Sequence, residues 1–593
     1  MTLEYITLGL YLLALPFLGL LFSKLNTNLS DFVRGGGQGT WWLVGTSILM
    51  SHTSAFTFTG NASAAFEAGP TVLVIYAANV VALLIGAWFL GAWFRQTRAY
   101  TKTDVVRQRF GVLVEQFNAY TMVVLSPFAA AIQLWALAVF ANSIFGFPLQ
   151  GSIVVIGFIV IFYSTTGGKW AVMATDFMQS LIMISITLLV AVLAIIKIGG
   201  FGEFFSFFSQ PEFARDFAFA KEPGAFPTDR FTLKWIFVIF FMTIYAQISL
   251  NGADRYLAVR DGIGARKASF LAAILMAVGS VIWFIPPMVA RFLYGDAIMA
   301  QDVANPSNTS YAYIARELLP NGMMGVMIAA MFAATMSAMD TGLNVQVGVI
   351  ARNIVPPLRR FFGRTEDMAP KAEVLMCKFI TLGLGALIIT YSILFSLNKE
   401  LILFDAYLTV NSTIGIPLVF PLLIGMWVKK IPSWSYFTIF GFCMLPSIYS
   451  LYMNLVYDVS HTIQDRALWI FIFGFIGTAV SVPFYKRSPA VYKEQVQEFF
   501  VRMHTPIDFI KEVGISRTHI QLIILGRVSV ATGLVLSLLL LVPNTLWARV
   551  GVFSVAGFSA FVGVLLLIGA RAEKRREDAL IARVEGQAAE GDE

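Results

Sequence analysis

Two stretches of the chain combine an apolar setting with side chains that could hold a cation or a polar solute. Residues 45–61 contain seven hydroxyl side chains, one histidine and one asparagine, and residues 243–254 mix polar side chains with a glycine. Hydroxyl, amide and carbonyl oxygens coordinate hard cations and also hydrogen-bond hydroxylated or zwitterionic molecules. The pattern indicates binding chemistry, and the sequence shows no nucleophile–base pair or cofactor motif that would indicate an enzyme.

The composition of the chain indicates that these stretches belong to a membrane protein. Of the 593 residues, 58% are hydrophobic and 13% are charged. Continuous apolar runs recur along the length, so we expect an all-α polytopic membrane protein and not a β-barrel. We predict about 15 spans of roughly 20 residues each, at 4–22, 42–66, 71–94, 120–145, 152–164, 171–196, 235–251, 271–292, 321–348, 373–395, 401–427, 434–452, 467–485, 528–543 and 550–569.

The two polar stretches fall in the second and seventh of these spans. Polar groups within a bilayer are costly unless they line a cavity or contact a neighbouring helix. In inverted-repeat transporters, corresponding helices of the two halves break near the bilayer midplane and expose carbonyls to ions and solute. A separation of five spans fits a five-plus-five repeat, and we therefore predict a break in each of the two helices.

The loop charges predict the orientation of the chain. With the spans above, 31 of the 42 Lys and Arg residues lie in loops opposite the N-terminus and 10 lie on the N-terminal side. By the positive-inside rule, the N-terminus is outside and the C-terminus cytoplasmic in a plasma (inner) membrane. The formal charge of +7 is thus explained by membrane topology and not by a nucleic-acid partner.

Four segments, in order along the chain, resemble landmarks of the sodium:solute symporter family, which includes the sodium–glucose and sodium–proline transporters. They are the Trp-Trp pair and Ser/Thr-rich span at 41–62, the Tyr-Ser-Thr-Thr-Gly-Gly segment at 163–179, the Asp-Arg-Tyr-Leu segment at 254–257 and the Ala-Ala-Thr-Met-Ser segment at 333–344. The resemblance covers about residues 4–430. It implies a leucine-transporter-like five-plus-five inverted repeat, preceded by one helix and followed by extra C-terminal helices, that works by alternating access.

The resemblance also implies a sodium site between the second and ninth spans. The corresponding ligands here are the carbonyls of Met50, Thr53 and Ala334 and the hydroxyl of Ser337. A broken helix frees carbonyls that have lost their intrahelical partners, and such oxygens suit a hard cation.

This chain departs from the family pattern at Ala338, where the family usually has a second hydroxyl residue. Asp340, three residues beyond Ser337 on a similar helical face, is a substitute ligand through water. Asp176 on the neighbouring helix adds negative field. A weaker sodium site and proton coupling through a carboxylate both fit this arrangement.

Candidate solute-binding residues come from the resemblance and from polar groups at mid-membrane depth. Phe56 and Thr57 match the solute-facing stretch of the family, and Tyr76 and Asn79 align with solute-binding positions of its sugar-transporting members. The alternative for Thr57 is a hydrogen bond to its own helix, and for Asn79 a contact between helices.

Five further polar residues are candidates from their position alone. Intramembrane amides and carboxylates are expensive and are functional candidates by default. The alternative for Gln133, in the fourth span, is a hydrogen bond that joins two helices. The alternative for Asp405 is a solvated position near the external boundary. The group comprises Gln133, Gln247, Ser249, Asn251 and Asp405.

We therefore predict a secondary transporter that couples sodium to symport of a sugar, sugar acid or amino acid. Proton-coupled symport and a solute sensor on the same fold are the alternatives. The expected partners are the solute, Na⁺ as coupling ion and the lipid bilayer, with no other cofactor, no catalytic residue and no transition-metal site; the oligomeric state is left open. The predicted units are a symporter core at 1–430, two further helices at 431–485, a cytoplasmic amphipathic segment at 486–526, two C-terminal helices at 527–570 and a frayed charged tail at 571–593.

Overall fold

The computed structural model describes residues 4–11, 29–303, 305–364, 366, 368–397, 403–459, 461–512, 514 and 518–591. Within this part of the chain the structure is helical, and β-structure is limited to the isolated bridges Gly39–Val259 and Lys221–Thr232. In the described ranges, eleven helices are long and apolar enough to cross a membrane, and three shorter apolar helices accompany them. The all-α prediction is confirmed, whereas the count of 15 spans stays a prediction because most of the first span, 4–22, lies outside the described residues.

The first predicted break is present between α3 and α5. Helix α3 (Trp41–Ser51) ends one residue before His52, and a short α4 (Ala55–Phe58) leads into α5 (Gly60–Ala68). Ser54 begins α4 with a capping box, in which its hydroxyl accepts from Phe56 N and the Thr57 hydroxyl accepts from Ser54 N. This local hydrogen bonding replaces the helical bonds that the interruption removes.

The second predicted break follows α13 (Leu233–Gln247), where a short 3₁₀ helix, η5 (Leu250–Arg255), replaces the α-helix. A third interruption occurs inside α10 (Leu149–Ile198), where Gly168 has φ 59° and separates the predicted fifth and sixth spans. A positive φ is favourable for glycine because it lacks a Cβ. Polar composition and glycine thus place all three interruptions.

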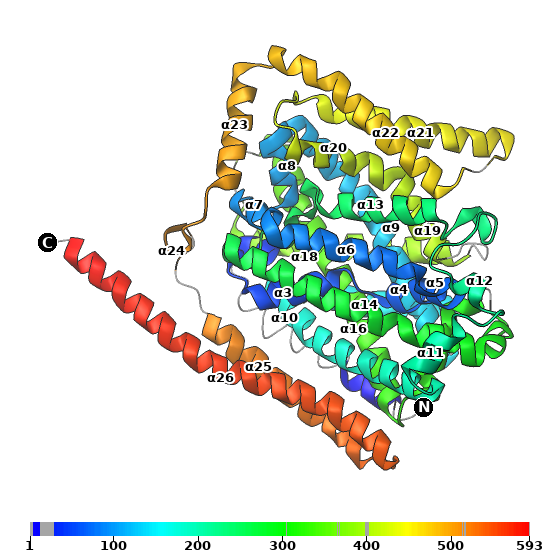
Figure 1. The fold of residues 1–593 in the computed structure, drawn as a ribbon. Helices are drawn as coiled ribbons and strands as arrows, with labels where there is room; N and C mark the ends of the chain where they lie inside the picture. The colour runs from blue at the N-terminus through cyan, green and yellow to red at the C-terminus, as the bar shows by residue number, and fades with distance from the viewer. Residues whose placement is uncertain are drawn as a thin grey trace.

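The interrupted helix α3–α5 lies at the centre of the bundle (Figure 1). Helix α14 (Gly262–Met299) packs along α3, α5 and α6 (Leu73–Ile85), and α16 (Met323–Val349) packs against α3, α4, α9 (Val112–Phe145) and α10. Nearly the whole surface of α16 is buried. The interruption is therefore enclosed by helices from distant parts of the sequence.

Two helical pairs lie at opposite edges of this bundle (Figure 1). Helices α21 (Ser435–Tyr457) and α22 (Ile463–Ser481) form one pair, and α25 (Thr518–Ser537) and α26 (Leu546–Gly591) form a hairpin beside α10. A Cβ added at Gly533 would come within 2.7 Å of the Ala556 carbonyl oxygen. The close approach of α25 and α26 thus depends on small residues at their contact.

The C-terminal hairpin differs from the predicted spans in two ways. Helix α25 begins at Thr518, ten residues before the predicted span, because Leu522 and Leu525 continue its buried face even though Arg527 interrupts the apolar run. Helix α26 continues to Gly591 beyond Arg571, where we expected a frayed tail. A contact between His519 and Glu577 joins the two helices near the start of that extension.

Candidate transport site

A cavity of about 290 Å³ lies beside the interruption between α3 and α4. Side chains from α4, α6, α9 and α13 line it. Six of the nine predicted solute-binding residues are among them: Phe56, Thr57, Tyr76, Asn79, Gln133 and Gln247. The fold therefore brings residues separated by up to 191 positions in the sequence to one polar pocket.

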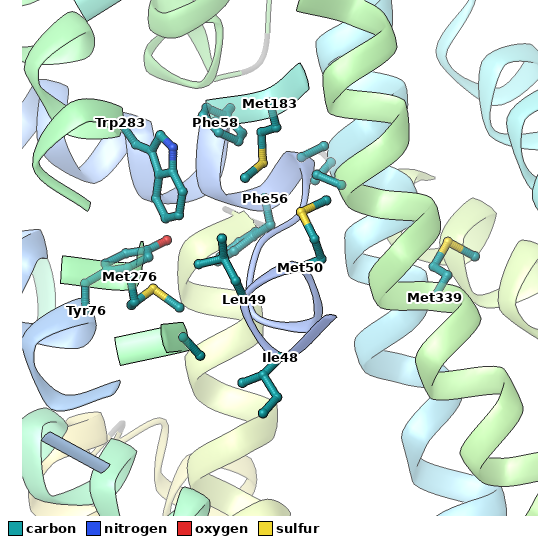
Figure 2. Packing of buried hydrophobic residues seen from close by; sticks show 14 of the residues in the cluster. Ile48, Leu49, Met50, Phe56, Phe58, Tyr76, Met183, Met276, Trp283 and Met339 are labelled. Carbon is teal, nitrogen blue, oxygen red and sulfur yellow. The ribbon is translucent and has the colours of Figure 1, made fainter. Parts of the chain in front are cut away.

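The Tyr76 hydroxyl connects two sides of this cavity. It accepts a hydrogen bond from Asn61 Nδ2 at 2.8 Å and donates a hydrogen bond to Thr57 Oγ1 at 3.4 Å. The Tyr76 ring packs edge-on against Trp283, with the ring centroids 6.0 Å apart, beside the labelled residues of the interruption in Figure 2. Tyr76 is thus held in place by polar and aromatic contacts at once.

A chain of hydrogen bonds runs along another wall of the cavity. Gln247 Nε2 donates to Asn79 Oδ1 at 3.2 Å, and Arg255 Nη1 donates to Gln247 Oε1 at 2.5 Å. Among the described lining residues, Arg255 is the one permanently charged group. None of the ion pairs between described residues includes it. Sequence reasoning missed Arg255 as a pocket residue, although it belongs to the Asp-Arg-Tyr-Leu landmark.

The other three solute candidates do not contribute to the described cavity wall. Ser249 is fully buried, and its hydroxyl donates to Ala246 O at 3.1 Å. Asn251 and Asp405 lie in helices whose backbone is described, but their side chains lie outside the described part of the structure. His52, at the interruption, lines the cavity and contacts Ile48 O through Nδ1 at 2.8 Å.

A second cavity, of about 390 Å³, adjoins the first. The two share Ile132, Gln133, Tyr407 and Asn411, which therefore separate them. Side chains of α9, α16 and α20 (Ile416–Trp427) form much of the second wall, together with Lys102 and Asp254. The two cavities are therefore adjacent, with these four side chains between them.

The predicted sodium ligands lie where α16 packs against α3 and α4. The backbone amide of Ala55 donates to Thr335 Oγ1 on α16 at 2.8 Å, which fixes the start of α4. The Met50 carbonyl accepts from Thr53 N at 3.2 Å, and no described donor bonds to the Thr53 carbonyl. Ala334 and Ser337, one position before and two after Thr335, are buried on the same helix.

Two buried aspartates flank this region, and each contacts a serine. Asp176 on α10 accepts from Ser47 on α3 through Oδ2, and Asp340 on α16 accepts from Ser164 on α10. The Ser337 hydroxyl lies within interaction range of Asp176, yet neither Ser337 Oγ nor Asp176 Oδ1 has a hydrogen-bond partner among the described residues. The geometry therefore places unpartnered oxygens of both residues in the interior.

Ala338 faces the second cavity and not a packed interface. A hydroxyl at this position has space, so its absence is not forced by crowding. The sequence did not identify Ser47, Ser164 or Thr335, because their partners lie 129, 176 and 280 positions away, respectively.

Comparisons with known proteins agree with this architecture. A model of the sodium:solute symporter family matches residues 32–434. The sodium/sialic acid symporter NanT of Aliivibrio fischeri is 23% identical over 447 residues, covering 72% of this chain and 84% of the relative. The sodium/myo-inositol cotransporter 2 of Oryctolagus cuniculus is 28% identical over 371 residues, covering 57% of this chain and 54% of the relative.

A solved structure of a Na⁺-coupled sialic acid symporter in a substrate-bound outward-open state has the same fold. Its TM-score is 0.68 at 19% identity, covering 81% of this chain and 97% of that chain. This likeness supports the leucine-transporter-like fold.

The protein is thus a multi-pass integral membrane protein of the transporter class. The chain belongs to the sodium:solute symporter family, a family of sodium-coupled transporters and not of enzymes.

Proposed function

We propose that the protein couples sodium entry to the symport of a small polyhydroxylated solute, neutral or carrying a carboxylate. The observation that carries this proposal is the 290 Å³ polar cavity beside the broken helix α3–α4. Its volume is close to the lower end of the roughly 300–1,000 Å³ range of small-molecule sites, which suits a molecule the size of a monosaccharide.

The cavity wall supports a sugar or sugar acid over an amino acid, because its described lining contains no carboxylate to pair with an amino acid's ammonium group. Hydroxyl and amide groups of Thr57, Tyr76, Asn79 and Gln247 offer both donors and acceptors, which recognise a polyol from several sides. Arg255 adds a positive charge with no described carboxylate paired to it, and a guanidinium binds a carboxylate well. The two relatives above are named for sialic acid, an acidic member of this solute class, and for myo-inositol, a neutral member.

The proposed sodium site comprises the carbonyls of Met50, Thr53 and Ala334 and the hydroxyl of Ser337. The Thr53 carbonyl and the Ser337 hydroxyl have no described hydrogen-bond partner, so their oxygens are available to a cation. Asp176 and Asp340 supply negative charge nearby. Sodium bound here favours the conformation in which α3 and α4 are aligned with α16, and this differential affinity couples the ion to the transport cycle.

We propose the second cavity as the route between the solute site and the basic, cytoplasmic face. Lys102 in its wall belongs to one of the Lys- and Arg-rich loops of that face. Rearrangement of Gln133, Tyr407 and Asn411 would open the partition between the cavities.

Uptake into proteoliposomes tests the solute class. The panel of radiolabelled solutes contains a neutral sugar and the matching sugar acid, a polyol and an amino acid. Uptake of each solute is measured in sodium buffer and in choline buffer. We expect sodium-stimulated uptake of a sugar, sugar acid or polyol, reduced by Tyr76→Phe. Uptake of the amino acid alone would overturn the solute assignment, and binding without uptake would indicate a sensor.

A further inference from the structure

Residues 490–512, here called the strap, run along the edge of the bundle and connect α22 to the C-terminal hairpin (Figure 1). They lie beyond residue 434, where the family match ends. The strap consists of α23 (Ala490–His504) and α24 (Phe509–Glu512). One face of α23 is buried against α7 (Gly91–Gln96) and α8 (Lys102–Phe110), so the strap is docked on the core.

The N-terminal end of the strap is anchored by a fully buried arginine. Arg109 Nη1 donates to Tyr492 Oη at 2.7 Å, and Arg109 Nε and Nη2 donate to the Gly425 and Val428 carbonyls at 2.8 and 2.9 Å. Tyr492 Oη in turn donates to Ile431 O at 3.1 Å. One guanidinium therefore joins α8, the end of α20 and the strap.

The C-terminal end of the strap is held by a bidentate ion pair. Arg98 Nε and Nη2 lie 2.7 and 2.8 Å from the two carboxylate oxygens of Glu512. The same guanidinium donates to the carbonyls of Thr505 and Pro506 at 3.4 and 3.2 Å. A bidentate arginine–carboxylate pair is the strongest and most directional surface ion pair.

The backbone of Arg98 is in an unfavourable conformation, with φ 59°. A residue with a Cβ rarely adopts this left-handed region, and it persists where surrounding contacts fix it. Here the Arg98 side chain is fixed by the strap and by the Gln96 carbonyl, which accepts from Nη1 at 2.9 Å. Loss of the ion pair therefore removes one of the constraints that hold the loop between α7 and α8 in this form.

The two loops that contact the strap, which carry Arg98 and Arg260, continue into the wall of the 390 Å³ cavity. Arg98 lies four residues before Lys102, and Arg260, which stacks on Phe509 with its guanidinium carbon 4.5 Å from the ring centroid, lies six residues after Asp254. Lys102 and Asp254 both line that cavity. The strap thus contacts the two chain segments that carry Lys102 and Asp254, the charged residues of the cavity wall.

We propose that Glu512 is a positioning residue of the transport cycle, whose ion pair with Arg98 latches the strap and stabilises the conformation that contains the 390 Å³ cavity. This inference goes beyond the proposed function, because it depends on neither the coupling ion nor the solute. It assigns the segment after the family match a role in the balance between conformations.

Cysteine labelling in the full-length protein tests the latch. Ser126→Cys places a thiol of similar size in the cavity wall, while the native Cys377 and Cys443 are buried. The protein is reconstituted in nanodiscs without solute and labelled with a small hydrophilic thiosulfonate. We expect Glu512→Gln to slow the labelling by about threefold or more, in line with the loss of one well-formed ion pair.

The matched control is Lys511→Gln, which removes a charge from the neighbouring exposed residue and should leave the rate unchanged. The Arg98→Gln background tests whether Glu512 acts through the ion pair. There, adding Glu512→Gln should change the labelling rate by less than about 1.5-fold, because the partner of Glu512 is already lost. A labelling rate in Glu512→Gln equal to that of the wild type, equal slowing in Lys511→Gln, or full slowing by Glu512→Gln in the Arg98→Gln background would each overturn the proposal. The labelling rate is measured without uptake. A failure of the latch proposal can therefore be distinguished from a failure of the proposed symport.

Discussion

The Ser47 hydroxyl on α3 donates to Asp176 Oδ2 on α10 at 2.5 Å, and both side chains are buried. This bond connects the helix that breaks at His52 to the helix that is interrupted at Gly168. Among the described residues, one of the two Asp176 oxygens has no hydrogen-bond partner. A buried carboxylate in this state is costly unless further charge or hydrogen bonds compensate it. A sodium ion near Asp176 and Ser337 would provide that compensation.

Replacing Asp176 by asparagine tests this role, because the side chain keeps its shape and loses its charge. We expect the sodium concentration for half-maximal uptake to rise by roughly 10-fold to 100-fold, the usual cost of losing a supporting carboxylate at a metal site. Uptake is measured against sodium concentration at fixed pH. A sodium dependence equal to wild type would remove Asp176 from the site.

Ala338→Ser restores the hydroxyl that the family usually has at this position. Ala338 lines the 390 Å³ cavity, so space is available for the added oxygen. One more ligand of hydrogen-bond strength, about 0.5–1.5 kcal/mol, should tighten sodium half-saturation by about 2- to 10-fold. The control is Ala129→Ser, in the same cavity wall on α9. If both variants behave like wild type, the proposed site is misplaced.

Thr335→Val tests the bond that fixes the start of α4. Valine has the shape of threonine but cannot accept from Ala55 N, so a buried amide loses its partner at a cost of about 1–3 kcal/mol. We expect a lower Tm and weaker sodium dependence. Thr187→Val is matched to it, since the partners of the buried Thr187 hydroxyl among the described residues are carbonyls of its own helix. Equal effects of the two variants would show that Thr335 acts by packing alone.

Lys221, in the segment between α12 (Ala214–Phe217) and α13, predicts a pH effect on stability. Its ammonium donates to Ala68 O at 2.8 Å and to Thr71 Oγ1 at 3.1 Å, at the end of α5. Burial lowers the pKa of Lys221 from 10.5 to about 8. Between these two values the unfolded chain binds the proton and the folded protein does not, so the free energy of unfolding should rise with pH in this window.

The measurement is the Tm of wild type and Lys221→Met in detergent from pH 7.5 to 10. The difference, wild type minus variant, should increase with pH, because methionine has no proton to release. A difference that is constant or that falls across this range would contradict the buried, proton-poor state of Lys221.

The overall architecture could be predicted from the sequence because local features determine it. Apolar runs predicted the helices, and polar runs predicted a break in each of the second and seventh spans. The gap between the predicted fifth and sixth spans, at 165–170, contains the interruption in α10. The start of α25 was misplaced because Arg527 lies inside the helix, a charge that hydropathy penalises even where the chain continues as a helix.

The contacts that organise the candidate site could not be predicted. Ser47, Ser164 and Thr335 look like ordinary helix residues, and only the packing of α3, α10 and α16 reveals their partners. Arg255 was visible in a recognisable segment, but its reach into the cavity depends on how η5 turns away from α13.

The most direct test of sodium-coupled symport is concentrative uptake driven by sodium alone. Proteoliposomes with an inward sodium gradient are clamped to equal pH on both sides with a protonophore, and the solute identified from the panel is followed over time. We predict accumulation above the external concentration, which collapses when sodium is equalised. Accumulation that needs a proton gradient and is unchanged when choline replaces sodium would contradict the account.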